Sequence, residues 1–345
     1  MSVAGIFSGL SPDIGIDLGT AATPVMECGR GITLREPSYV AYDRLNDSLV
    51  AYGAKAKQMK GRMPSNIEVI RPVRKGVVAD YKACEAMLRC LISRTRRGLL
   101  GPRIMVGVPV DVTDVERKAV SEAVKSAGAR SVYVVPQPLA AAVGCGLPVM
   151  EAHGTMIVDI GGGTSQAAVM SMGGIIVSDS IRVAGDSFDD ALVDYLRHEH
   201  NLLVGPSIAE RVKIEAGAAV KGEEVETYAA GRDIKTGIPR KVRLTSDEIC
   251  HALSGVLDEI ADLVKRVLEN TPPEFADDIV EYGISLSGGS SLLRGIDRFL
   301  SKRTGVYCKV TEEPLSSVAY GVEKMFGDPR LMRSLFGSAH IAVRS

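Results

Sequence analysis

The chain is predicted to be an α/β protein made of two related halves. An apolar run that ends in Asp17–Thr20 is matched by a second run that ends in Asp159–Thr164. The 345 residues exceed the usual size of a single core, which favours two domains. Strand-like and helical patterns alternate in both halves, as in α/β folds. We therefore expect two half-molecules that face each other across a phosphate group.

Each half is expected to place an anion-binding turn directly after its first strand. The apolar runs Ile14–Ile16 and Ile157–Val158 indicate buried strands. Glycine lets the backbone turn sharply and bring N–H groups close to an anion, and the threonine adds a hydroxyl donor. Asp17 and Asp159 at the strand ends can hold Mg²⁺, usually through water. One such turn resembles an ordinary hairpin, so the prediction depends on the matched pair.

The first half is expected to begin with a meander of short strands and to continue with alternating helices and strands. Thr113–Glu116 has the pattern of a capping box, so Glu116 is expected to bond the Thr113 backbone rather than act in catalysis. The expected strands are Ile14–Ile16, Ile32–Leu34, Tyr39–Tyr42, Ser48–Ala51, Ile104–Val108 and Ser131–Val135, and the helices cover 80–97, 114–128 and 139–146.

The second half repeats this order. A polar stretch with short strand-like runs, Gly217–Arg243, is expected to form a small inserted lobe, and the stretch after Gly327 is expected to be a poorly anchored tail. The expected strands are Ile157–Val158, Gln166–Met170, Gly174–Val177 and Ile284–Leu286, and the helices cover 186–200, 207–217, 246–270 and a segment starting near Leu292.

Composition argues against several classes of protein. A formal net charge of −1 does not favour nucleic acid as a partner. Six scattered cysteines without a Cys-x-x-Cys pair indicate reduced thiols in the cytoplasm. Met1–Leu10 lacks the Lys or Arg of a signal peptide, and no apolar run reaches the roughly 20 residues that span a bilayer. His198–His200 lacks the spacing of a metal site, and Lys55–Lys57 indicates a solvated or subunit-contact face.

The two phosphate turns and a third Gly-Gly-Ser turn at Gly288 resemble the superfamily of actins, sugar kinases and heat-shock-chaperone ATPases. Over residues 13–326 the chain is similar, more narrowly, to the MreB family of bacterial actins. The motifs that carry this resemblance are Asp17–Ala21, Arg35–Ser38, Ile70–Pro72, Gly107–Pro109, Thr113–Arg117, Asp159–Thr164, Asn201–Leu203 and Arg266–Glu269.

The resemblance implies an actin-like ATPase fold, with two duplicated ribonuclease-H-like domains that each carry a small inserted subdomain. Domain I would comprise residues 1–145 and 320–345, with a small lobe over about 33–69. Domain II would comprise residues 146–319, with a small lobe over about 186–250. ATP and Mg²⁺ would lie between the two domains.

The resemblance also implies the site residues. Asp17 and Asp159 would hold the metal, and Gln137, Asp159 and Thr164 would act in hydrolysis. Glu210 and Lys213 would contact the nucleoside, whereas their spacing alone, without the resemblance, favours a solvated ion pair. The remaining nucleotide contacts would be Gly19, Thr20, Ala21, Ala22, Thr23, Gly161, Gly162, Gly163, Gly185, Gly288, Gly289, Ser290 and Ser291.

Several positions depart from the family pattern. Gln137 stands where the family has the second Glu of Glu-Glu-Pro, the residue thought to position or activate water. Glutamine is no base at neutral pH but can orient water, and eukaryotic actin is similar in having Gln there. Gln166 replaces Glu, Ala22 replaces Asn, and Ser290 replaces a common Gly. We therefore expect secure nucleotide binding and slow hydrolysis.

A basic loop around Leu99 and Leu100 could meet a membrane. Basic residues attract anionic lipid and exposed leucines insert at the interface, although these leucines could instead fold back onto the domain. The resemblance implies filaments of the chain with itself, a cytoplasmic location at the inner membrane face, and cell-shape or cell-wall synthesis proteins as partners. The alternatives are a nucleotide-binding scaffold with little turnover, and a small-molecule kinase or chaperone-type ATPase on the same fold.

Overall fold

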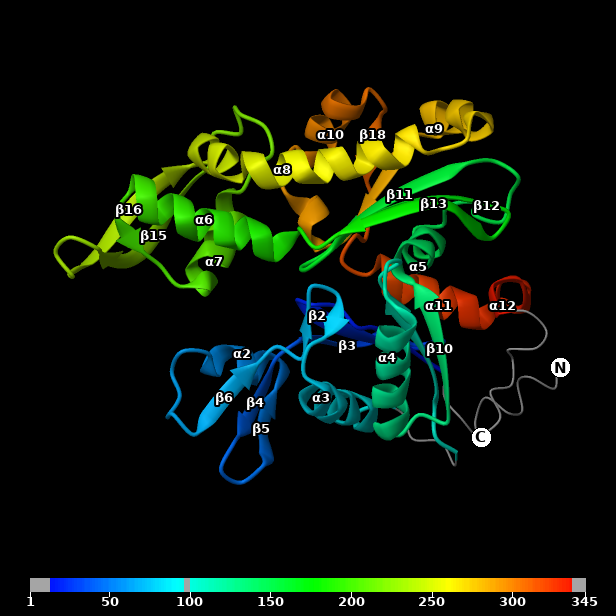
Figure 1. Cartoon of the computed structure of the whole chain (residues 1–345), viewed down its shortest axis with the longest axis horizontal. Helices are drawn as coiled ribbons and strands as arrows, with labels where there is room; N and C mark the ends of the chain where they lie inside the picture. Colours follow the sequence, from blue (N-terminus) through cyan, green and yellow to red (C-terminus); the bar gives the residue numbers. More distant parts are fainter. Residues whose placement is uncertain (1–12, 96–99, 337–345) are drawn as a thin grey trace.

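The computed structural model describes residues 13–95 and 100–336, and within them two five-stranded sheets share one topology (Figure 1). The first sheet has the spatial order β3 (Gly31–Pro37), β2 (Ala22–Glu27), β1 (Asp13–Asp17), β9 (Arg103–Val108) and β10 (Ser131–Pro136). The second has the order β13 (Gly174–Ile181), β12 (Ser165–Ser171), β11 (Thr155–Ile160), β17 (Ile284–Ser287) and β18 (Cys308–Val310).

Strand directions repeat as well as strand order. In each sheet the first three strands form an antiparallel meander, and the last two run parallel to the central strand. Asp17 ends β1 opposite Gly107, and Asp159 lies near the end of β11 opposite Ser287. The expected duplication is confirmed, and it puts the two aspartates at equivalent places.

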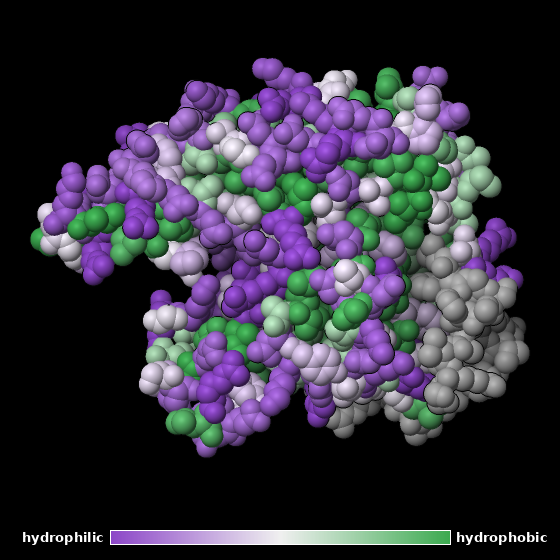
Figure 2. Space-filling view, in the orientation of Figure 1, coloured by the Kyte–Doolittle hydropathy of each residue, from purple (hydrophilic) through white to green (hydrophobic). Residues whose placement is uncertain are grey.

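Each large sheet carries a smaller one. The first small sheet has the order β5 (Ser48–Tyr52), β4 (Val40–Asp43) and β6 (Ile67–Ile70), beside α2 (Gly53–Met59) and the ladder of β7 (Val73–Arg74) with β8 (Val77–Val78). The second has the order β14 (Leu202–Leu203), β15 (Glu226–Asp233) and β16 (Pro239–Thr245), beside α6 (Gly185–Glu199) and α7 (Pro206–Ala216). We call these parts the small lobes. Both lie at the left of Figure 1, and the surface is hollowed between them (Figure 2).

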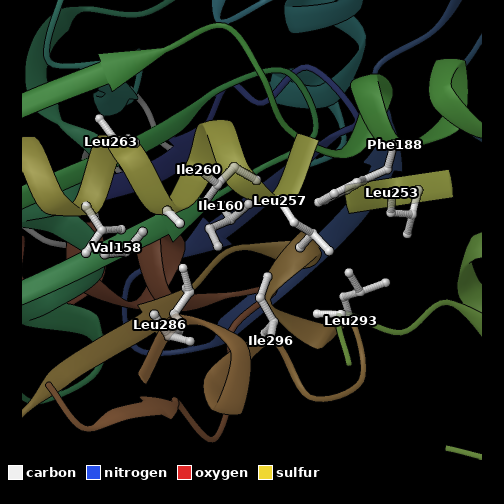
Figure 3. Close-up of a cluster of buried hydrophobic side chains, with 14 of the residues drawn as sticks. Val158, Ile160, Phe188, Leu253, Leu257, Ile260, Leu263, Leu286, Leu293 and Ile296 are labelled. Carbon is white, nitrogen blue, oxygen red and sulfur yellow. The ribbon is translucent and has the colours of Figure 1, made fainter. Parts of the chain in front are cut away.

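Amphipathic helices bury the outer faces of the large sheets. α3 (Tyr81–Ser93) and α4 (Asp114–Ser126) share the core of the first sheet, and α8 (Ser246–Glu269) packs on the second. α8 places Leu257, Ile260 and Leu263 in one core with Val158 and Leu286 (Figure 3). Burying each such side chain contributes about 1.5–3 kcal/mol. α9 (Ala276–Tyr282), α10 (Ile296–Thr304) and the 3₁₀ turn η1 (Pro273–Phe275) complete this half.

Two helices lie between the large sheets and touch through their backbones. α5 (Gln137–Gly144) packs on α11 (Ser317–Gly327), in a core that takes Met105 from the first sheet and Ile157 from the second. A Cβ atom at Gly321 would lie 1.7 Å from the Ala140 carbonyl oxygen, and one at Gly144 would lie 1.8 Å from that of Ser317. Only glycine permits this approach.

Local predictions are largely confirmed, with three differences. The capping box of Thr113 and Glu116 is present, because each side chain bonds the other residue's backbone N–H. The chain after Gly327 is not a loose tail up to residue 336, since it forms α12 (Pro329–Phe336), whose Leu331 is buried in the core between the sheets.

The segment near Leu292 is the second difference, because it forms the 3₁₀ turn η2 (Gly289–Leu292) and α10 begins only at Ile296. The intervening Gly295 has a φ of 70°, which breaks the helix. The third difference is a set of elements that the sequence did not predict, among them the strands β2 and β6 and the helices α2, α9 and α11. In residues 13–95 and 100–336, no helix has the length and apolar character needed to cross a bilayer.

Candidate functional site

The ends of the two central strands open into one cavity of about 440 Å³. A volume of this size accommodates a ligand as large as a nucleotide or a drug-like molecule. Its wall includes all three glycine turns predicted from the sequence, together with residues of both small lobes. From the predicted set it contains Asp17, Gly19, Thr20, Ala21, Ala22, Gln137, Asp159, Gly161, Gly162, Gly163, Thr164, Gly185, Glu210, Lys213, Gly288, Gly289 and Ser290.

The first two turns lie directly against each other. A Cβ atom at Gly162 would lie 2.6 Å from Cβ of Ala21, and one at Gly163 would lie 2.5 Å from Oγ1 of Thr20. Side chains at these glycines would therefore force the halves apart. The Thr20 hydroxyl accepts a hydrogen bond from the Gly76 N–H at 3.0 Å, which ties the first turn to the loop between β7 and β8.

Two carboxyl groups lie at the base of the cavity. Asp159 is buried, and loss of hydration together with the nearby Asp17 raises its pKa to about 7, although a hydrogen bond with Ser287 opposes the shift. Loss of hydration raises the pKa of Asp17 to about 6, opposed by a hydrogen bond from Gln137. A cation between them would favour both ionised forms.

This donor set suits a hard divalent cation that keeps other ligands. Among the described residues, no group of three or more His, Cys, Asp or Glu side chains is placed to hold a metal ion. Mg²⁺ commonly takes one or two carboxylates and completes its shell with water and phosphate oxygens. Asp17 and Asp159 therefore fit Mg²⁺ bound together with a phosphate ligand.

Gln137 is the first residue of α5 and lies beside this pair. Its Nε2 donates to Oδ1 of Asp17 at 2.9 Å, and its Oε1 accepts from Nε2 of Gln166 at 2.8 Å. Oε1 of Gln166 in turn accepts from the Val110 N–H at 2.9 Å. Both glutamines are buried, with exposed fractions of 7% and 0%. The amide predicted to orient water is thus held at both ends.

Glu210 and Lys213 lie one turn apart on α7 but do not pair with each other. Lys213 contacts Asp189 at 2.7 Å and donates to the Gly185 carbonyl at 2.7 Å. Burial raises the pKa of Asp189 to about 6, and the Lys213 ammonium opposes that shift. Glu210 instead pairs with Lys57 of the opposite small lobe at 2.8 Å. The two side chains thus lie at the cavity, each with its own partner.

The third turn closes the far end of the cavity. Gly288 has a φ of 84°, and a Cβ there would lie 2.3 Å from the Ile160 carbonyl oxygen. The Ser290 hydroxyl donates to the Gly161 carbonyl at 2.7 Å, which joins the second and third turns. Leu292 and Leu315, both about half exposed, add an apolar wall. Such a wall suits a flat ring.

The structure does not bring two of the predicted residues into the wall of the cavity. Thr23 is fully buried on β2, where its hydroxyl bonds that of Ser38 at 2.9 Å. The hydroxyl of Ser291 donates to the Gly288 carbonyl at 2.7 Å and stabilises the turn. Both side chains satisfy internal hydrogen bonds, so they support the turns from behind.

An ion pair that was not predicted from the sequence joins the two halves beside the cavity. Arg71 contacts Asp186 at 3.0 Å and donates to the Thr20 carbonyl at 2.9 Å, so one side chain from the first half holds the start of α6. Asp186 and Asp189 follow Gly185 three residues apart, which places them in the first turns of a helix beside a phosphate turn. That position could have marked them as site residues.

Comparisons with known proteins agree with this geometry. The family model described as MreB/Mbl protein matches residues 11–334. The chain is 47% identical to the cell shape-determining protein MreB of Escherichia coli (strain K12) over 319 residues, 90% of this chain and 92% of the relative. It is 41% identical to the cell shape-determining protein Mbl of Bacillus subtilis (strain 168) over 316 residues, 91% of this chain and 95% of the relative.

Solved structures give the same result for the fold. MreB5 of Spiroplasma citri bound to ADP superposes with a TM-score of 0.89 at 36% identity, covering 94% of this chain and 98% of that one. A MamK double helical filament matches with a TM-score of 0.79 at 18% identity, over 92% of this chain and 99% of that one. The fold is therefore actin-like, as predicted. From the family model and these relatives together, the chain belongs to the MreB/Mbl family.

Proposed function

We propose that this chain binds ATP with Mg²⁺ between its two halves and polymerises into filaments that take part in determining cell shape. The cavity between two matched Asp–Gly–Thr turns carries the proposal, because it combines paired carboxylates with two glycine turns that lie directly against each other. MreB5 of Spiroplasma citri, whose solved structures hold ADP and AMPPNP, supports it at 36% and 35% identity.

In this proposal each part of the cavity wall contacts a different part of Mg-ATP. The turns at Gly19–Ala21 and Gly161–Gly163 take the phosphates, and Glu210 and Lys213 meet the ribose. The adenine lies against the third turn and the apolar wall. Mg²⁺ bound by Asp17 and Asp159, directly or through water, would neutralise charge on the phosphates.

Hydrolysis is proposed to be slow and to depend on Gln137. An amide can orient water but cannot accept its proton at neutral pH, and phosphoryl transfer depends chiefly on positioning and charge stabilisation. Thr164 and Asp159 also line the cavity. Phosphate release by the Gln137→Ala variant tests this role, and an unchanged rate would remove Gln137 from the mechanism. Because Gln137 offers an amide in place of the family's carboxylate, a nucleotide-binding scaffold with little turnover is the second candidate.

Membership of the family and a head-to-tail arrangement of copies support the proposed filament formation. A single chain that binds its own copy head to tail, without closing a ring, extends into a filament. In this proposal both domains bind the same ATP. The bound nucleotide would then determine how the two domains are placed relative to each other, and so the shape of the filament subunit. The proposed partners are further copies of the chain and proteins of cell-shape determination and cell-wall synthesis.

Sedimentation followed by electron microscopy tests the proposal directly. The full chain is mixed with Mg-ATP, Mg-ADP or EDTA, with and without anionic vesicles, and pellets are imaged. Filaments that require Mg-ATP support the proposal. Absence of polymers at all nucleotides, salts and lipids would contradict it, and ATP consumption that depends on an added sugar would favour a kinase instead. The Asp17→Asn variant, expected to bind Mg-ATP poorly, serves as the matched control.

We further propose that the chain works in the cytoplasm at the inner membrane face. Leu100 is 47% exposed, and Arg94 and Arg103 lie on either side of this loop, whereas Leu99 lies outside the described residues. Pelleting with anionic liposomes compares the unchanged chain with Leu99→Ser/Leu100→Ser. Equal binding by the two proteins would contradict insertion of this loop.

A further inference from the structure

Four groups from four separate segments form one row of hydrogen bonds that reaches the cavity wall at Gln137 and Asp17. The row runs from the Val110 N–H to Gln166, from Gln166 to Gln137, and from Gln137 to Asp17, over distances of 2.9, 2.8 and 2.9 Å. We call this row the amide chain. Gln166 lies on β12 with no exposed surface, so water cannot replace any partner that it loses.

The two ends of the amide chain determine the direction of every bond in it. A backbone N–H can only donate, so the group of Gln166 that faces Val110 is its oxygen. An ionised carboxylate can only accept, so the group of Gln137 that faces Asp17 is its nitrogen. The nitrogen of Gln166 then meets the oxygen of Gln137, as the structure has it. Reversing either amide would set two like groups against each other.

We propose that Gln166 is a positioning residue, which holds the Gln137 amide in one orientation at the phosphate end of the cavity. The proposal rests on the proposed ATP hydrolysis for its effect on rate, but the orientation itself is a property of the protein without nucleotide. Gln137 keeps one N–H and one lone pair beyond those in the amide chain, and it borders the cavity. These are the groups left to orient an attacking water.

Two substitutions separate the bonds of Gln166. Gln166→Glu keeps the volume and the acceptor for the Val110 N–H but has no donor for Gln137 when ionised. Gln166→Met removes both bonds while keeping an unbranched side chain. Gln58 supplies the matched control, because it is exposed on α2 and is the remaining glutamine in a sequence with three.

The first measurement uses nitrogen-15 labelling of glutamine alone and follows the side-chain amides by nuclear magnetic resonance without nucleotide. Three glutamines give three pairs of amide protons. We expect slow solvent exchange for Gln137 and Gln166, and a shift of the Gln137 pair in both Gln166 variants. Gln58→Met should leave the Gln137 pair in place. An unmoved Gln137 pair in Gln166→Glu and Gln166→Met would overturn the proposal.

The second measurement follows phosphate release in a single turnover, together with ATP affinity. We expect Gln166→Met to lower the rate constant about tenfold, equivalent to roughly 1.4 kcal/mol, with ATP affinity little changed. In the double variant Gln137→Met/Gln166→Met the rate should equal that of Gln137→Met alone, because Gln166 acts through Gln137. Rate losses that multiply in the double variant would show that Gln166 acts independently.

The two measurements separate this proposal from the proposed function. A protein that binds no ATP or releases no phosphate contradicts the proposed function, while the amide spectrum still decides whether Gln166 orients Gln137. If Gln166→Met fails to fold, Gln166→Glu, which keeps the Val110 bond, gives the same spectroscopic comparison.

Discussion

Replacing Asp159 with asparagine should stabilise the nucleotide-free protein while weakening its binding of Mg-ATP. The side chain is 6% exposed and lies near a second carboxyl, so its pKa rises to about 7 from an ordinary 3.8. The unfolded chain releases this proton near pH 4 and the folded chain only near pH 7. The folded state therefore binds more protons across that window, and its stability falls as pH rises through it.

The expected magnitude follows from the size of the shift. About three pKa units correspond to about 4 kcal/mol of unfolding free energy, fully developed above pH 7 and absent below pH 4. The asparagine side chain carries no charge, so at pH 8 the unfolding free energy of the variant should exceed that of the unchanged protein by up to that amount. With an unfolding entropy of about 2.1 cal/mol/K per residue, the melting temperature should rise by roughly 5 °C.

Urea unfolding in EDTA without nucleotide, repeated from pH 4 to pH 8, measures this difference. The exposed Asp111→Asn variant is the control and should change stability by less than about 0.5 kcal/mol at every pH. ATP affinity with Mg²⁺, measured in parallel, should fall for Asp159→Asn. A difference in stability that does not grow with pH, or a variant less stable at pH 8, would refute the reasoning.

Three further substitutions test other contacts. Gly321→Ala should lower the unfolding free energy by about 3 kcal/mol because its Cβ would overlap the α5 backbone, whereas Gly327→Ala on the same helix, with open space, should be neutral or stabilising. Lys57→Ala should raise the nucleotide dissociation rate by a factor of about two to five, since a partly exposed ion pair contributes about 1 kcal/mol or less. Lys213→Met should destabilise the protein at neutral pH by roughly 3 kcal/mol, because it leaves the buried carboxylate of Asp189 unpaired.

Thermal and urea unfolding check the first and third of these, and stopped-flow release of a fluorescent ATP analogue checks the second. Equal stability of the two glycine variants would show that the helices can separate freely. A dissociation rate unchanged by Lys57→Ala would mean that the pair between the small lobes is open in the bound state. At a pH below the pKa of Asp189 this carboxyl group is neutral and needs no charged partner. A stability loss in Lys213→Met that persists there would point to lost packing rather than to an unpaired charge.

Most of the fold could be predicted because its patterns are local. The strand-ending Asp17 and Asp159 turns, the capping box of Thr113 and the helix over 246–270 each depend on residues within a few positions of one another. Where glycine conformation decides a boundary, as at Gly295, the apolar pattern alone placed the next helix too early.

The site could be predicted only in part, because its contacts join distant segments. Gln137 and Gln166 were both recognised as departures from the family pattern, but nothing in the sequence shows that they touch. Likewise, Lys57 was expected on a solvated or subunit-contact face, and the structure pairs it with Glu210 across the cavity. Such pairs need the relative placement of the two halves, which no local pattern contains.

The contact between α5 and α11 also has a mechanical consequence. Gln137 begins α5, and Ala140, which meets Gly321, lies three residues later, about 4.5 Å along the helix axis. A rotation of about 10° around that crossing would move Gln137 by less than roughly 1 Å. The ion pair of Lys57 joins the small lobes, which lie far from the crossing of α5 and α11. The same rotation would therefore move this ion pair much further than it moves Gln137. A rotation of the two halves about this crossing would therefore displace the small lobes widely while leaving the Gln137 amide nearly in place.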